Sequence, residues 1–391
     1  MPNFRFDQVI DRRVVPALKH HEMVLGSDGM DLFAAGVADM DFCVAPCITD
    51  AIKRRAAHSV FGYEAMPEGL IPALVGWMEM RHNWTIDPKH ILRAPNVLNT
   101  LAMATNCFTN TGDGIIVQPP VFFDFADIIA ENDRQIIENP LILRDGRYEM
   151  DLNGLDQLAA QPNVRMLYLC NPHNPVGRVW THDELGRLGQ ICRKNDVLVV
   201  SDEIHADITF PGHSHTPFAS LSPEDAANAV ICLSPAKSFN IASCCMSFSV
   251  VADEDRRKTM QLENSRLTVN KNNAFASAAM EAAYSHGGPW LDAVCDYILG
   301  NLDLTRERLR KIPNVDLIEP EGTFLLWLDF RALGLAPDKL NHFLRKEVGW
   351  SITRGIAFGP TGKGFGRLNI ACPRSQLDRA LNGLQLAVSK S

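Results

Sequence analysis

The sequence predicts an α/β protein whose core is a mostly parallel β-sheet covered by helices on both faces. One observation is a series of apolar runs that each end in turn residues, namely "GDGIIVQPP", "NVRMLYLCNP", "DVLVVSDE" and "NAVICLSPAK". A second is the segment between the second and third runs, where Leu185, Leu188 and Cys192 recur at helical spacing. Continuous apolar strands that alternate with amphipathic helices are typical of a parallel sheet buried on both sides.

The helix between the second and third runs has a recognisable beginning. In "THDELGRLGQICRKN", Thr181 is followed three residues later by Glu184. This spacing is a capping box, in which each side chain binds the backbone N–H of the other residue. We therefore expect a helix that starts directly after Thr181.

The two ends of the chain lack this regular alternation. The C-terminal part contains a strand-like run, "GTFLLWLDF", and two helix-like segments, "DKLNHFLRKEVG" and "QLDRALNGLQLAV". We expect a large domain over residues 46–286. Residues 1–45 and 287–391 are expected to form one smaller α+β domain together.

The composition excludes several classes of function. Of the 391 residues 46% are hydrophobic and 21% are charged, as in ordinary soluble globular proteins. The net charge of −8, without runs of Lys or Arg, argues against binding to nucleic acid or an anionic membrane. No apolar stretch approaches the ~20 residues that span a bilayer. The ten scattered cysteines and the absence of an apolar leader predict a cytoplasmic protein with reduced thiols.

Polar side chains follow three successive strands of the predicted sheet. They are Asn171 and Asn174 after one strand, Asp202 after the next, and Ser234 and Lys237 after a third. In open parallel sheets, ligands bind beyond the carboxyl ends of the strands. We therefore expect these side chains to converge on one ligand site.

Lys237 is the unusual member of this group, because lysine is rarely buried. A lysine that loses its hydration has a lowered pKa and can attack carbonyl groups. The best-known use is covalent attachment of pyridoxal 5′-phosphate, with an aspartate against the pyridine nitrogen. Asp202 suits that second role, and Asn174 can donate to the phenolic oxygen of the cofactor ring.

The cofactor phosphate needs hydroxyl and free backbone N–H groups. Ser234 offers a hydroxyl. In "RAPNVLNTLAMATN", Pro95 is placed to open a helix whose N-terminus would face the anion.

Simpler explanations exist for each residue taken alone. Lys237 could be a surface lysine, Asp202 a helix cap, and Asn174 part of a turn. None of these explanations accounts for three such residues after successive buried strands.

Two other motifs are weaker. "GPTGKGFG" resembles a phosphate-binding loop, but Gly364 stands where that motif requires Ser or Thr. His205, His213 and His215 cluster in sequence without the spacing of known zinc enzymes, so no metal site is expected.

The segments "NPHNPVG", "SDEIHAD" and "SPAKSFN" resemble the cofactor motifs of the class I/II aminotransferases, which are fold-type-I pyridoxal-phosphate enzymes. With "FDQVIDRR", "VADMDF", "VFGY" and "RLNIACPRS", the chain looks most like the MalY/PatB branch of bacterial cystathionine β-lyases, or C–S lyases. The resemblance implies a mostly parallel seven-stranded sheet in the large domain.

The resemblance also implies roles for residues around the cofactor. Lys237 would carry the cofactor covalently, Asp202 would pair with the ring nitrogen, and Asn174 and His205 would contact the phenolic oxygen. Phe122 would stack on the ring, where the branch usually has Tyr. The phosphate would be bound by Ser234, by the backbone N–H groups of Val97 and Leu98, and by Tyr63 of a neighbouring subunit, which implies a homodimer.

The substrate implied by the resemblance is a small L-amino acid. Arg367 would bind its carboxylate, together with Asn174 and the backbone of Ala38. The lysine segment lacks the Gly-x-Arg-x-Gly run of many aminotransferases, which favours the lyase branch, whereas Phe122 puts the usual lyase substrate in question. We predict a C–S β-lyase, with an aminotransferase as the alternative and a non-catalytic cofactor-binding regulator as a remote one.

Overall fold

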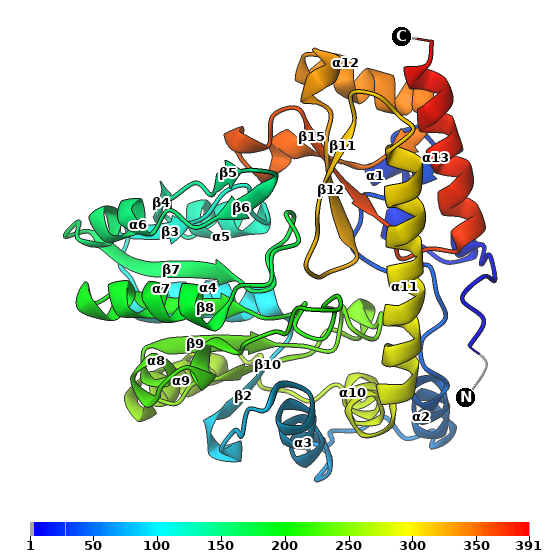
Figure 1. Ribbon diagram of the computed structural model, residues 1–391. Helices are drawn as coiled ribbons and strands as arrows, with labels where there is room; N and C mark the ends of the chain where they lie inside the picture. The colour runs from blue at the N-terminus through cyan, green and yellow to red at the C-terminus, as the bar shows by residue number, and fades with distance from the viewer. Residues whose placement is uncertain (1–3, 28, 391) are drawn as a thin grey trace.

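The computed structural model describes residues 4–27 and 29–390, and a large mixed β-sheet forms its centre (Figure 1). In this part of the chain the large sheet has seven strands in the order β2-β10-β9-β8-β7-β3-β4. These strands are β2 (Ile91–Ala94), β3 (Gly114–Val117), β4 (Gln135–Glu138), β7 (Val164–Cys170), β8 (Leu198–Asp202), β9 (Ala229–Leu233) and β10 (Ser247–Val250). β10 pairs antiparallel with both of its neighbours, β2 and β9, and the other neighbouring strands pair in parallel. The predicted α/β class and mostly parallel sheet are confirmed.

Successive residues of the central strands enter two different apolar layers. Val199 and Ile231 belong to the layer that contains α6 (Leu152–Ala159) and α7 (His182–Lys194). Val200, which follows Val199 on β8, belongs to the opposite layer. The helices packed in that second layer are α4 (Val97–Phe108), α5 (Asp124–Glu131) and α9 (Glu254–Arg266). Successive side chains of a strand point to opposite faces, so both faces of the sheet are buried, as its apolar strands require.

The expected start of α7 is confirmed. The Thr181 hydroxyl accepts from the Glu184 backbone N–H at 3.2 Å, and the Glu184 carboxylate accepts from the Thr181 N–H at 2.9 Å. This helix carries the chain from β7 to β8. It therefore places Asn174 and Asp202 at the same edge of the large sheet.

The remaining elements lie around the large sheet or form a second part of the molecule (Figure 1). The helices are α1 (Glu22–Leu25), α2 (Pro46–Ala57), α3 (Leu70–His82), α8 (Pro223–Ala227), α10 (Ala274–His286), α11 (Gly288–Leu309), α12 (Pro337–His342), which continues as a π-helical turn (Phe343–Val348), and α13 (Arg374–Val388). A small antiparallel sheet contains β11 (Asp316–Ile318), β12 (Leu325–Asp329), β15 (Phe365–Asn369) and β14 (Thr353–Arg354). Two further pairs are β1 (Phe33–Ala34) with β13 (Trp350–Ser351), and β5 (Ile142–Arg144) with β6 (Arg147–Glu149).

The parallel β1–β13 pair joins the N-terminal segment to the C-terminal part of the chain. This contact supports a small domain built from both ends, and we retain as a proposal the division into 46–286 and 1–45 with 287–391. Residues 1–3, 28 and 391 of that division lie outside the described residues.

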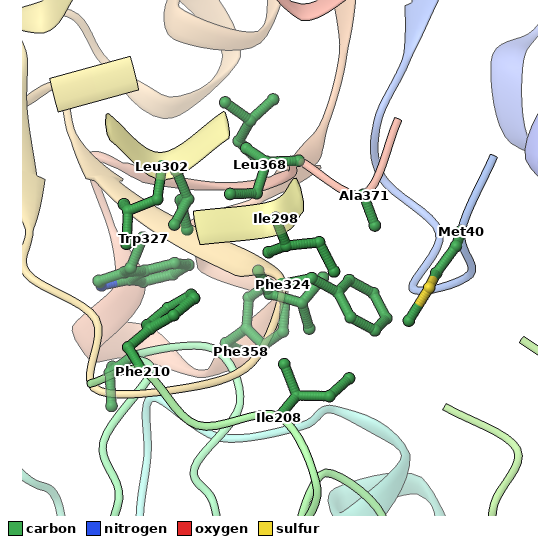
Figure 2. Close-up of a cluster of buried hydrophobic side chains, with 14 of the residues drawn as sticks. Met40, Ile208, Phe210, Ile298, Leu302, Phe324, Trp327, Phe358, Leu368 and Ala371 are labelled. Atoms are coloured by element: carbon green, nitrogen blue, oxygen red, sulfur yellow. The ribbon is translucent and has the colours of Figure 1, made fainter. Parts of the chain in front are cut away.

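An apolar cluster connects the small sheet with the loop after β8 (Figure 2). Ile298 and Leu302 of α11 face Trp327 of β12, while Ile208 comes from the loop below them. Phe324 belongs to the same cluster. Its ring also contacts His205, with 5.8 Å between ring centroids. The cluster thereby fixes the small sheet beside the carboxyl edge of the large one.

Among the described residues, no helix combines the length and hydrophobicity that crossing a membrane requires.

Candidate active site

A cavity of about 300 Å³ lies at the carboxyl edge of the large sheet. Asn174 follows β7, Asp202 ends β8, and Ser234 and Lys237 follow β9. All four line this cofactor cavity, so the structure brings together the residues that the sequence placed after successive strands. Asn171 does not line it, and its amide donates to the backbone oxygen of Thr216 instead.

Lys237 is half-buried and extends toward the N-terminal part of the chain. Its Nζ atom donates to the backbone oxygen of Ala38 at 2.7 Å. Burial lowers the pKa of Lys237 to about 8, and the positive charge of Arg367 acts in the same direction. A larger share of the amine is therefore neutral near pH 7 than for an exposed lysine, which favours attack on a carbonyl.

Asp202 is buried and lines the same cavity as Lys237. Its Oδ1 atom accepts from the Ile204 N–H at 3.1 Å. Burial nevertheless raises the pKa of Asp202 to about 6. A protonated ring nitrogen in the cavity would supply the positive partner that such a buried carboxylate needs.

The turn that carries Lys237 is held by its next residues. Ser238 donates to Asp207 at 2.6 Å. Asn240 has φ of 57° and accepts from the Met40 N–H while donating to the Met40 oxygen, both at 2.9 Å. These contacts fix the turn against residues 36–42. Ser238, Asp207 and Asn240 were not among the expected site residues, although all three lie inside the segments SPAKSFN and SDEIHAD.

Arg367 of β15 is buried and lines a second cavity, which adjoins the first and shares Lys237 with it. It donates to Asn174 Oδ1 at 2.9 Å and to the Gly36 oxygen at 2.6 Å. Its Nε has no hydrogen-bond partner among the described residues, and burial lowers the pKa of Arg367 to about 10. A carboxylate would satisfy both the charge and the remaining donor. The Asn174 amide nitrogen remains available as a donor to a ligand in the cavity.

The phosphate end of the cavity is formed by the beginning of α4. Val97 and Leu98 line it, and the first N–H groups of a helix have no acceptor within the helix. The helix was expected to open at Pro95, but α4 begins at Val97, and Asn96 caps it with a side-chain oxygen that accepts from the Asn99 N–H. Asn and Asp at this position stabilise helix starts.

Ser234 lines the same end, but its hydroxyl has partners already. It donates to the Met246 oxygen at 3.1 Å and accepts from the Ala236 N–H at 3.2 Å. To donate to a phosphate, the hydroxyl would have to exchange the Met246 contact for the new one.

The remaining expected residues are placed in three different ways. His205 is buried in the cavity wall, and its Nδ1 lacks a partner among the described residues. Burial lowers the pKa of His205 to about 3, so the ring is neutral. Phe122 and Ala38 line the cavity. Tyr63 is fully exposed and does not line it in this single chain.

The three histidines near β8 do not meet. His215 pairs with Glu203 at 3.0 Å, whereas His213 is exposed. Within residues 4–27 and 29–390 there is no group of three or more His, Cys, Asp or Glu side chains arranged to hold a metal ion.

The fold and this cavity define an enzyme that binds an aldehyde cofactor through a half-buried lysine. The model of the class I and II aminotransferase family matches residues 30–384. The chain belongs to this family.

Individual relatives are more specific. The chain is 41% identical to cystathionine β-lyase PatB of Bacillus subtilis, over 92% of this chain and 93% of that protein. It is 30% identical to protein MalY of Escherichia coli, over 98% of this chain and 99% of that protein. The solved structure of cystalysin from Treponema denticola, which contains pyridoxal 5′-phosphate, superposes with a TM-score of 0.95 at 32% identity and covers 99% of both chains. These likenesses confirm the resemblance to the MalY/PatB branch.

Pyridoxal phosphate, the cofactor of this family, fits the residues present. Lys237 provides the amine, Asp202 the partner for the ring nitrogen, and the start of α4 an anion site. The unpartnered Nδ1 of His205 and the available Asn174 amide supply polar contacts for the ring substituents.

Proposed function

We propose that this chain is a pyridoxal-phosphate-dependent C–S β-lyase that acts on an L-cysteine-derived substrate. A substrate R–S–CH₂–CH(NH₃⁺)–COO⁻ and one water would give a thiol, pyruvate and ammonium. The observation that carries the proposal is that Lys237 lines two adjoining cavities, one lined also by Asp202 and the other by Arg367, in a chain 41% identical to a cystathionine β-lyase. When bound, the cofactor supplies an electron-withdrawing ring that stabilises the charge left at the substrate Cα.

The residues of this chain divide the remaining work. Arg367 binds the α-carboxylate and, because it is fixed by Asn174 and Gly36, sets the orientation of Cα. The Lys237 amine removes the Cα proton, for which its lowered pKa of about 8 is suited. Asp202 keeps a proton at the ring nitrogen. The thiolate then leaves from Cβ, and hydrolysis gives pyruvate and ammonium.

An aminotransferase shares every step up to proton removal, so the test must separate the products. The holoenzyme is incubated with cystathionine or an S-alkyl-L-cysteine in the absence of any keto acid. Pyruvate release supports the lyase. Amine exchange that requires a keto acid, without pyruvate release, would establish the aminotransferase, and a cofactor-binding protein inactive in both assays would be a regulator.

We also propose that the active unit is a homodimer. The segment before α3 exposes Val60, Phe61 and Tyr63, with exposed fractions of 66%, 59% and 104%. Phe61 also packs on Phe275, which is itself 37% exposed. A contiguous exposed apolar surface of this kind marks an interface. Burial of this surface between two copies would bring Tyr63 to the phosphate of the neighbouring subunit.

Light scattering of the holoenzyme measures the mass directly, and a monomer would contradict this proposal. Tyr63→Phe should weaken cofactor binding without changing the mass, because only the hydroxyl is lost.

The cysteines in the described residues are unpaired, which suits the reducing cytoplasm that we propose as the location.

A further inference from the structure

Asp124 occupies the boundary between the cofactor cavity and the entrance to it. The entrance cavity has a volume of about 820 Å³ and shares Ala38, Phe122, Asp124 and Lys237 with the cofactor cavity. Arg367, which would hold the substrate carboxylate, lines the entrance cavity as well. A substituent on the substrate sulfur must therefore pass close to these shared residues.

The carboxylate of Asp124 has no hydrogen bond or ion pair with any described residue. Among the described residues that line the entrance cavity it is the only acidic side chain, and it faces Lys237 and Arg367. Burial and the negative charge of Asp127 raise the pKa of Asp124, and the positive charges of Lys237 and Arg367 oppose that increase. The half-buried carboxylate thus depends on these two cations for its charge compensation.

Substrate binding removes that compensation. Lys237 has to be neutral to remove the Cα proton, and Arg367 is neutralised by the substrate carboxylate. The other two arginines at the entrance have partners elsewhere: Arg345 donates to the Leu25 oxygen at 2.5 Å, and Arg354 lies 3.9 Å from Asp338. A half-buried carboxylate without a countercharge is unfavourable, so the site favours a ligand that brings a positive group of its own.

We propose that Asp124 is a specificity-determining residue that selects substrates whose sulfur substituent carries a cationic group, such as an ammonium. This inference rests on the proposed lyase function and deepens it. Phe122 and Phe123 also line the entrance, so the methylene groups between sulfur and ammonium have apolar walls to contact. Beside these two rings, Asp124 supplies a polar group, which Phe122 cannot supply because it has no hydroxyl.

The test compares two substrates of equal length, S-(2-aminoethyl)-L-cysteine and S-propyl-L-cysteine. The sulfur substituent ends in an ammonium group in the first substrate and in a methyl group in the second. The kcat/KM for pyruvate release should favour the aminoethyl substrate by about tenfold, or about 1.4 kcal/mol. In Asp124→Asn, an isosteric change, this ratio should fall to about one. The control is Asp127→Asn on the same helix, which is exposed and lines neither cavity, and which should keep the ratio.

A second readout needs no turnover. In cofactor-loaded Lys237→Ala, each amino acid is titrated and binding is followed by visible absorbance, with and without Asp124→Asn. The same tenfold preference should appear in the dissociation constants and disappear with Asp124→Asn.

Two results would overturn the proposal. One is equal values for the two substrates in the unchanged enzyme. The other is an Asp124→Asn variant that loses activity on both substrates alike, which would indicate proton transfer instead of selection. If neither substrate releases pyruvate, the lyase function fails, while the titrations still decide the role of Asp124.

Discussion

The two ends of the active-site space are built differently. At the cofactor end, residues of the lysine turn have fixed partners: Lys237 binds the Ala38 oxygen, Ser238 binds Asp207, and Asn240 binds Met40. At the entrance, Asp124 has no partner among the described residues, and Phe122 contacts Phe123 and Phe125 through their rings. These hydrogen-bonded residues form a frame that carries the chemistry, and the replacement of any one of them breaks a hydrogen bond. Substrate choice rests on side chains that can be replaced with little effect on that frame.

The largest effect should come from Lys237→Ala, at the centre of the frame. The variant loses both the covalent attachment and the group that moves the Cα proton, so pyruvate release should fall by at least about a thousandfold. Steady-state assays measure the loss. The absorbance band of the holoenzyme should also lose its sensitivity to borohydride. A variant that retains a tenth of the activity would contradict the role assigned to this lysine.

Asp202→Asn should lower the activity by about a hundredfold and yet stabilise the cofactor-free protein above pH 6. Burial raises the Asp202 pKa from 3.8 to about 6. A raised carboxyl pKa contributes stability below pH 3.8 that is lost as the pH rises through 6. At pH 8 the ionised form therefore costs about 3 kcal/mol, which asparagine avoids.

Urea unfolding of the cofactor-free wild type and Asp202→Asn at pH 4 and pH 8 checks the sign. The advantage of the variant should be large at pH 8 and small at pH 4. An equal advantage at both values would show that the carboxyl does not titrate in this range.

Arg367→Lys should have an intermediate effect. Lysine keeps the charge but cannot donate to Asn174 and Gly36 while also presenting a fork to a carboxylate. We expect KM to rise by about tenfold or more, with a smaller change in kcat. Initial rates over a range of substrate concentrations separate the two. A fall in kcat alone would place Arg367 outside substrate binding.

The smallest effect should come from Phe122→Tyr at the entrance. The ring is half-buried and retains its packing, and one added hydroxyl contributes at most about one hydrogen bond. The kcat/KM for an S-alkyl-L-cysteine should change by less than about threefold. A change of a hundredfold would mean that the entrance takes part in the chemistry, and the difference between the two ends would no longer hold.

The same difference explains what could be predicted from the sequence. The strands and the capping box are local patterns, and Asn174, Asp202 and Lys237 follow those strands directly. Their convergence then follows from the topology of a parallel sheet. The family resemblance added Arg367 and its role, which no local pattern indicates.

Other features depend on contacts between distant segments. The place of Asp124 depends on where residues near 18–26 and 341–354 close the entrance. The periodicity of the sequence does not indicate which of these segments will come into contact. Asn240 could have been found as a polar residue inside the lysine motif, but its partner 200 positions away could not.

The contacts that hold residues 36–41 have a consequence for the order in which the protein is made. Arg367 and Asn369 bind the backbone oxygens of Gly36, Val37 and Asp39, across 330 or more positions of the chain. A ribosome therefore releases Lys237 and Asp202 long before it releases the residues that fix the opposite wall of their cavity. Capture of the cofactor in its final geometry has to wait until Arg367 and Asn369 have been synthesised.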